Sequence, residues 1–192
     1  MGDINTFLMV GRPGSGKGTQ AKLLSDKIGA PIFSTGGEFR ALAAGESYIG
    51  KRLKGAMESG ELLPHWLASF TFQKVLFTLE PEDKIVFEGA CRTGPEAALF
   101  EEMAQWLPRP YRAVHLRISE EEAWKRLLAR GAGKEQRADD DSTVIRKRFE
   151  EFKIKNEAVI EHFRSVGTLI EVNGEQSVET VHADVLKALN IL

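Results

Sequence analysis

Short apolar runs alternate along the chain with longer stretches in which apolar residues recur every three or four positions. Runs of strand length lie at residues 7–10, 32–33, 85–87, 113–118 and 168–172. The stretches between them have the periodicity of helices packed against a core. Because strands that alternate with helices are typical of parallel sheets, the pattern predicts an α/β fold with a doubly wound sheet of five parallel strands.

Two segments depart from this alternation. Residues 34–64 contain short helical pieces interrupted by glycines, which predicts a helical insertion, and residues 131–138 are too short and polar for a subdomain, which predicts a flexible lid. Beyond the lid, apolar residues from Val144 to Phe163 recur at helical spacing and predict one long amphipathic helix. We therefore expect a single domain over residues 1–192, with core segments at 1–33, 65–130 and 139–192, the insertion at 34–64 and the lid at 131–138.

The composition is that of a soluble globular protein, with 42% apolar and 28% charged residues. A net charge of −2 gives no reason to expect a nucleic-acid surface. Cys91 is the only cysteine, which excludes an intrachain disulfide and a four-cysteine zinc site. The chain has neither a signal-like start nor an apolar run that could span a bilayer, so we expect a cytoplasmic monomer without membrane or nucleic-acid partners.

The first apolar run leads into the sequence GRPGSGKGT at residues 11–19, which opens a helical stretch. Glycines let the backbone turn sharply and approach an anion, while loop N–H groups and the helix N-terminus converge on phosphate. The spacing matches a Walker A loop, in which Lys17 adds a positive charge, although Gly18 occupies the usual Ser/Thr position. We predict phosphate binding rather than an ordinary glycine-rich turn. The candidate residues are Gly14, Ser15, Gly16, Lys17, Gly18 and Thr19.

Four segments resemble motifs of the adenylate kinase family of nucleoside monophosphate kinases, in the same order and with similar spacing. They are residues 11–20, 34–40, 88–93 and 137–140. The similarity runs nearly end to end, and the lid resembles the short form found in that family. The resemblance implies reversible transfer of the ATP γ-phosphoryl group to a nucleoside monophosphate, with Mg²⁺ as the cofactor.

Phosphoryl transfer depends mainly on positioning phosphates and neutralising their charge, so arginines should converge from several segments. The resemblance implies that Arg40 and Arg92 hold the acceptor phosphate, and that Arg126 and Gly174 lie beside the ATP base. It places the following residues around the donor and the transferred group: Lys17, Arg92, Arg130, Arg137 and Arg148.

Local patterns test two of these arginines. On the helix after the lid, Arg148 falls roughly 60° from the centre of the apolar stripe, so it can reach inward or cover the core edge. Ser119 and Glu122 form a capping-box pattern at the start of another helix, on which Arg126 lies four residues after Glu122. An exposed ion pair between Glu122 and Arg126 is therefore the alternative to a role at the ATP base.

The acceptor pocket is implied by the resemblance. Its residues would be Thr35, Gly36, Arg40, Leu62, Leu63, Gly89, Arg92 and Glu96. A threonine at position 35 resembles the family members that bind adenine rather than those that bind uridine or cytidine. The spacing from Thr35 to Glu38 also predicts a capping box that starts at Thr35.

Several residues depart from the family pattern. Gly37 and Glu88 stand where the family has Asp, so Glu88 is expected near Mg²⁺ through water, with a structural hydrogen bond to Lys17 or the loop as the alternative. Ala90 and Cys91 replace an aromatic–proline pair before Arg92, which makes that turn less rigid.

Glu96 replaces the Gln that the family pairs with adenine. A carboxylate has no donor for N1 of adenine, whereas guanine offers two N–H donors, and a solvated acid at a helix start is a further possibility. AMP is the expected acceptor. GMP or another monophosphate remains open, and so does a nucleotide-binding regulator with little turnover.

Overall fold

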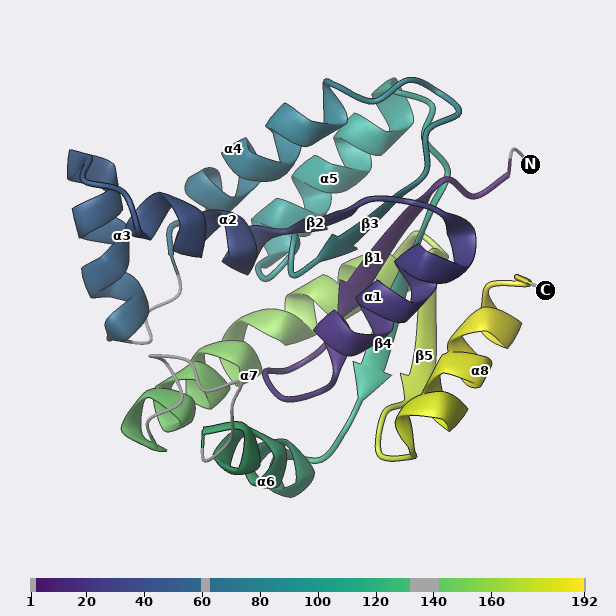
Figure 1. Ribbon diagram of the computed structural model, residues 1–192. Coiled ribbons are helices and arrows are strands. Elements are labelled where there is room, and N and C mark those ends of the chain that lie inside the picture. Colours follow the sequence, from purple (N-terminus) through teal and green to yellow (C-terminus); the bar gives the residue numbers. More distant parts are fainter. Residues whose placement is uncertain (1–2, 60–62, 132–141, 192) are drawn as a thin grey trace.

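The computed structural model describes residues 3–59, 63–131 and 142–191. Five parallel strands form one sheet in the order β2-β3-β1-β4-β5, with helices on both faces (Figure 1). The predicted doubly wound α/β fold is therefore confirmed. The strands are β1 Thr6–Val10, β2 Ile32–Ser34, β3 Ile85–Glu88, β4 Tyr111–Arg117 and β5 Leu169–Asn173.

Alternate residues of the central strand β1 face opposite layers of helices. Leu8 and Val10 pack towards α4 His65–Leu76, α5 Gly94–Trp106 and α7 Ser142–Ser165. Phe7 and Met9 pack towards α1 Lys17–Ile28 and α8 Val178–Ala188 on the other face. Both faces of the sheet are covered, which explains why its strands read as continuous apolar runs.

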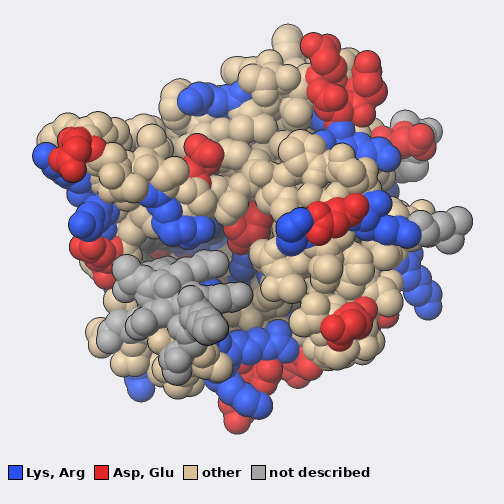
Figure 2. All heavy atoms as spheres, in the orientation of Figure 1, with Lys and Arg blue, Asp and Glu red and all other residues tan. Residues whose placement is uncertain are grey.

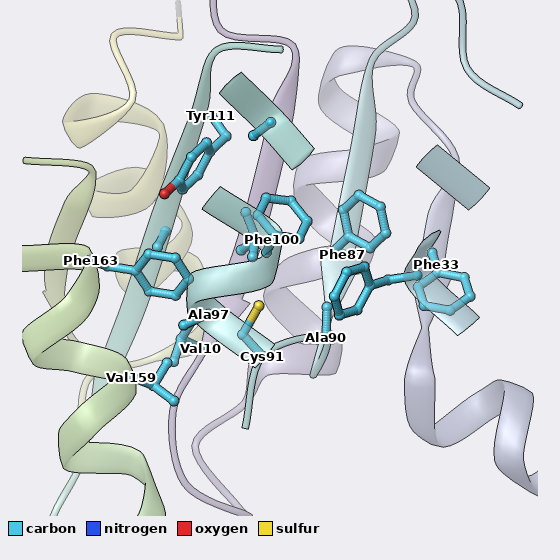
Figure 3. Close-up of a cluster of buried hydrophobic side chains, with 14 of the residues drawn as sticks. Val10, Phe33, Phe87, Ala90, Cys91, Ala97, Phe100, Tyr111, Val159 and Phe163 are labelled. Carbon is cyan, nitrogen blue, oxygen red and sulfur yellow. The ribbon is translucent and has the colours of Figure 1, made fainter. Parts of the chain in front are cut away.

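A row of aromatic rings crosses the first of these layers (Figure 3). The rings meet edge to face, with neighbouring centroids 5.4 to 5.8 Å apart, a favourable arrangement for aromatic pairs. They belong to Phe33, Phe87, Phe100, Tyr111 and Phe163. This row joins three strands to α5 and α7, and so packs the two helices against the sheet.

The segment after β2 forms α2 Thr35–Ala43 and α3 Tyr48–Glu58, which project beyond the sheet (Figure 1). Phe39 and Leu53 pack there against Leu67 of α4, whereas Phe72 of the same helix packs on the sheet. Helix α4 therefore connects the two parts of the structure. The division into core, insertion and lid remains a prediction.

Two long helices flank the predicted lid. They are α6 Glu120–Gly131 and α7, which spans 24 residues, as the periodicity between Val144 and Phe163 predicts. All of the lid except Gly131 lies outside the described residues. In the described part of the chain, no helix is long and apolar enough to cross a membrane.

The predicted cap of α2 is wrong. Its N-cap is Ser34, whose Oγ accepts a hydrogen bond from Gly37 N–H at 3.1 Å, and Thr35 is already helical. Ser34 is the last residue of β2 and keeps an extended backbone, so its hydroxyl is the one that reaches the free amides of the first helical turn.

Candidate active site

The loop between β1 and α1 owes its shape to glycines. Gly11, Gly14 and Gly16 all have positive φ angles, of 144°, 84° and 88°. A Cβ atom on Gly14 would lie 2.8 Å from the carbonyl oxygen of Ala123, so the loop can approach α6 only with glycine there. Gly16 caps α1 without a side-chain hydrogen bond, which leaves the first amides of the helix available to an anion.

Lys17 folds back over this loop. Its Nζ donates to the carbonyl oxygens of Gly11 at 2.6 Å and Arg12 at 2.8 Å. Burial lowers the pKa of Lys17 from 10.5 to about 8, and Glu88 nearby opposes the shift. Three arginines add to the lowering of the Lys17 pKa, namely Arg92, Arg148 and Arg130. Cations from three distant segments of the sequence therefore lie close enough to Lys17 to lower its pKa.

Two cavities meet at this position. The loop cavity, of about 800 Å³, lies between the residue 11–19 loop, α6 and the segment after β5. The insertion cavity, of about 160 Å³, lies between α2, the turn after β3 and α7. The residues that line both are Pro13, Lys17, Arg40, Glu88 and Arg148. Figure 2 shows Lys and Arg side chains gathered around a hollow in this face of the molecule.

Two guanidinium groups converge on Gly36 in the insertion cavity. A Cβ atom on Gly36 would lie 3.2 Å from Nη1 of Arg40 and 3.5 Å from Nη2 of Arg92. The side chain of Arg92 is also bound to its own turn, because its Nε donates to the carbonyl oxygen of Gly89 at 3.1 Å. The sequence places these two arginines 52 positions apart, and the fold brings them to one glycine.

Glu88 ends β3 on the wall between the cavities. Its Oε2 accepts a hydrogen bond from Ser34 Oγ at 2.7 Å, and the same hydroxyl accepts from Gly37 N–H. Within the described residues, no group of three or more His, Cys, Asp or Glu side chains is placed to hold a metal ion.

Helix α6 contributes two of the predicted cations, Arg126 and Arg130, to the loop cavity. The capping box at its start is present in part, because Ser119 Oγ accepts from Glu122 N–H at 3.2 Å. Arg126 Nε donates to Glu122 Oε1 at 2.7 Å, so the predicted ion pair exists, and Arg126 still lines the cavity together with Gly174. The two interpretations of Arg126 are compatible in this geometry.

Comparison with known proteins agrees with this architecture. A family model described as "Adenylate kinase" matches residues 9–168. The "Adenylate kinase" of Rhizobium meliloti (strain 1021) is 31% identical over 189 residues, which cover 95% of this chain and 98% of that protein. The "Adenylate kinase" of Brucella ovis is 32% identical over 189 residues, with 95% and 97% covered. The chain belongs to the adenylate kinase family. It is therefore a phosphotransferase of the nucleoside monophosphate kinase type.

Two residues predicted in the acceptor pocket of this adenylate kinase family member are almost inaccessible. Thr35 is fully buried, and its Oγ1 has no hydrogen-bond partner. Glu96 is 1% exposed, and its carboxylate accepts from the backbone N–H of Arg92 and the hydroxyl of Thr93. Neither residue is among those that line the two cavities. Leu63 lines the insertion cavity, whereas Leu62 and Arg137 lie outside the described residues.

Several residues that line the cavities have no site role in the sequence analysis, among them Gln20 and Asn156. Gln20 lines the loop cavity, where its Nε2 donates to the carbonyl oxygen of Val178 at 2.9 Å and its Oε1 is buried without a partner. Asn156 lines the insertion cavity and is 8% exposed. An amide within the apolar stripe of α7 is a signal that identifies Asn156, whereas the signal for Gln20 is its place at the end of the family-like segment 11–20.

Proposed function

We propose that the protein transfers the γ-phosphoryl group of ATP to AMP in a reversible reaction that gives two ADP. The observation that carries the proposal is the wall common to the two cavities, which contains Lys17, Arg40 and Arg148. Nucleotides in neighbouring cavities would present their phosphates to the same cations. Such an arrangement supplies the positioning and charge neutralisation on which phosphoryl transfer mainly depends.

ATP would occupy the loop cavity. The amides at the start of α1 and the mobile charge of Lys17 suit its β- and γ-phosphates, and Arg130 lies on the same cavity wall. The adenine would lie between Arg126 and Gly174. A Cβ atom on Gly174 would lie 2.8 Å from Ile118 Cγ2, so the close packing of this segment also favours glycine. Arg137 keeps its expected role at the transferred group.

AMP would occupy the insertion cavity with its phosphate between Arg40 and Arg92. Gly36 supports this assignment, because it leaves open the space in which both guanidinium groups converge. A base would pack against Phe39 and Leu63, both of which line the cavity.

Mg²⁺ is the cofactor that we propose, bound to ATP phosphates and water. The carboxylate of Glu88 fits a contact through water, because it lies on the common wall and carboxylate oxygen is a preferred partner of this ion. When bound, the ion would supply additional neutralisation of phosphate charge. We further propose that the enzyme acts as a cytoplasmic monomer, as the sequence leads us to expect.

The test is to incubate the enzyme with ATP and Mg²⁺ and each nucleoside monophosphate in turn, and to measure ADP and acceptor diphosphate. We expect two ADP for each AMP consumed, with little ATP hydrolysis when no acceptor is present. Nucleotide binding without diphosphate formation from any acceptor would contradict the proposal and indicate a nucleotide-binding regulator instead.

A further inference from the structure

The turn between β3 and α5 carries Arg92 to the insertion cavity. It has no proline, and Ala90 and Cys91 are buried in its middle. Figure 3 shows the sulfur of Cys91 pointing into the cluster of apolar side chains near Ala97. Cys91 Sγ also lies 3.8 Å from the carbonyl oxygen of Glu96, as a weak donor. The turn is thus anchored to the first turn of α5.

Glu96 supplies the second anchor. Its Oε2 accepts from Arg92 N–H at 2.8 Å, and its Oε1 accepts from Thr93 Oγ1 at 3.0 Å. The Thr93 hydroxyl accepts in return from Glu96 N–H at 3.4 Å and caps α5. Both oxygens of this carboxylate therefore bond to the turn, and neither lies on a cavity wall.

The choice of a carboxylate at this position has a physical reason. Burial raises the pKa of Glu96, and the hydrogen bonds from Arg92 and Thr93 oppose that rise. A buried carboxylate is costly, but it is the side chain that accepts at both of its oxygens, whereas an amide accepts at only one. A carboxylate can therefore accept from two donors of the same turn, the N–H of Arg92 and the hydroxyl of Thr93.

We propose that Glu96 is a positioning residue for Arg92, and that it acts on the binding of the acceptor phosphate. This inference rests on the proposed function, because Arg92 must meet the acceptor phosphate for its position to matter. It assigns phosphate binding, and not base selection, to the residue that replaces the family's glutamine.

The test compares AMP with GMP as acceptors for wild type, Glu96→Gln, Glu96→Ala and the control Glu102→Gln on the exposed side of α5. Glu96→Ala should raise KM for both acceptors by about tenfold, the loss expected for hydrogen bonds to a charged group, while KM for ATP stays within twofold. Glu96→Gln should raise both acceptor KM values less, and Glu102→Gln should change neither.

Two results would overturn the inference. The first is a tenfold change in the ratio of kcat/KM for AMP to kcat/KM for GMP in Glu96→Gln. The second is a lower Tm in Glu96→Ala with unchanged acceptor KM, which would show a merely structural role. Absence of transfer to both acceptors by wild type would instead refute the proposed function.

Discussion

Two turns at the carboxyl edge of the sheet reach their shapes by different means. The loop after β1 has three glycines with positive φ angles, and Gly14 and Gly11 lie too close to backbone carbonyls for any side chain. The turn after β3 has a single such residue, Gly89, at φ 69°. Its remaining shape depends on the buried Cys91 and on the carboxylate of Glu96.

The shape of the first turn is determined by local sequence, whereas that of the second depends on tertiary contacts. The glycines of the first turn set its backbone geometry by themselves, so its anion site can be identified from nine consecutive residues. The second turn depends on a carboxylate four residues beyond Arg92 and on burial in a core built from distant segments. Its role in binding can be inferred only after the fold is known.

The largest effect should come from removing the charge of Lys17, which lines both cavities. Lys17→Met should lower kcat by about 10³-fold or more while the fold stays intact, since single phosphate-binding cations contribute on that scale. Steady-state kinetics and circular dichroism would measure this, with the exposed Lys22→Met on the same helix as the control. Activity within threefold of wild type would remove Lys17 from the mechanism.

Replacing one glycine in each turn by alanine should affect the KM values of the two substrates separately. In Gly14→Ala the new Cβ would clash with the carbonyl oxygen of Ala123, which should raise KM for ATP by about tenfold. In Gly89→Ala the new Cβ would lie 2.9 Å from Arg92 Nη2 and displace that side chain, which should raise KM for AMP instead. Gly29→Ala is the control, because it has φ 65° with nothing within 4 Å. It should lose about 1–2 kcal/mol of stability with both KM values unchanged. If the two variants impaired both substrates equally, the assignment of one turn to each nucleotide would fail.

A smaller effect should be the uptake of a proton by Lys17 when ATP binds. The pKa of Lys17 is about 8 in the free protein, so the side chain is mainly neutral above pH 8, and bound polyphosphate should raise that pKa. ATP binding at pH 9 should therefore take up nearly one proton, and ATP affinity should weaken as the pH rises. AMP binding should take up fewer protons, because the AMP phosphate would contact arginines, which stay charged at this pH. Calorimetry in buffers of different ionisation enthalpy measures the uptake, and an equal value for both nucleotides would contradict this account.

Much of the fold follows from the sequence, because strand and helix periodicities are local. The five strands, the long helix α7 and the glycine loop all occur where their patterns predict. The cap of α2 was assigned to Thr35 instead of Ser34, since the end of β2 could not be fixed to one residue. The internal bonding of Glu96 and the cavity contacts of Gln20 and Asn156 depend on tertiary packing, which local patterns do not contain.

The most direct measurement is a crystal structure with an analogue in which two adenosines are joined by five phosphates. The account predicts that one adenosine occupies each cavity and that the phosphates pass along the common wall. Lys17, Arg40 and Arg148 should lie within about 3 Å of phosphate oxygens, the distance of a charge-assisted hydrogen bond. Phosphates that bypass the wall, with these side chains turned away from the ligand, would contradict the central claim.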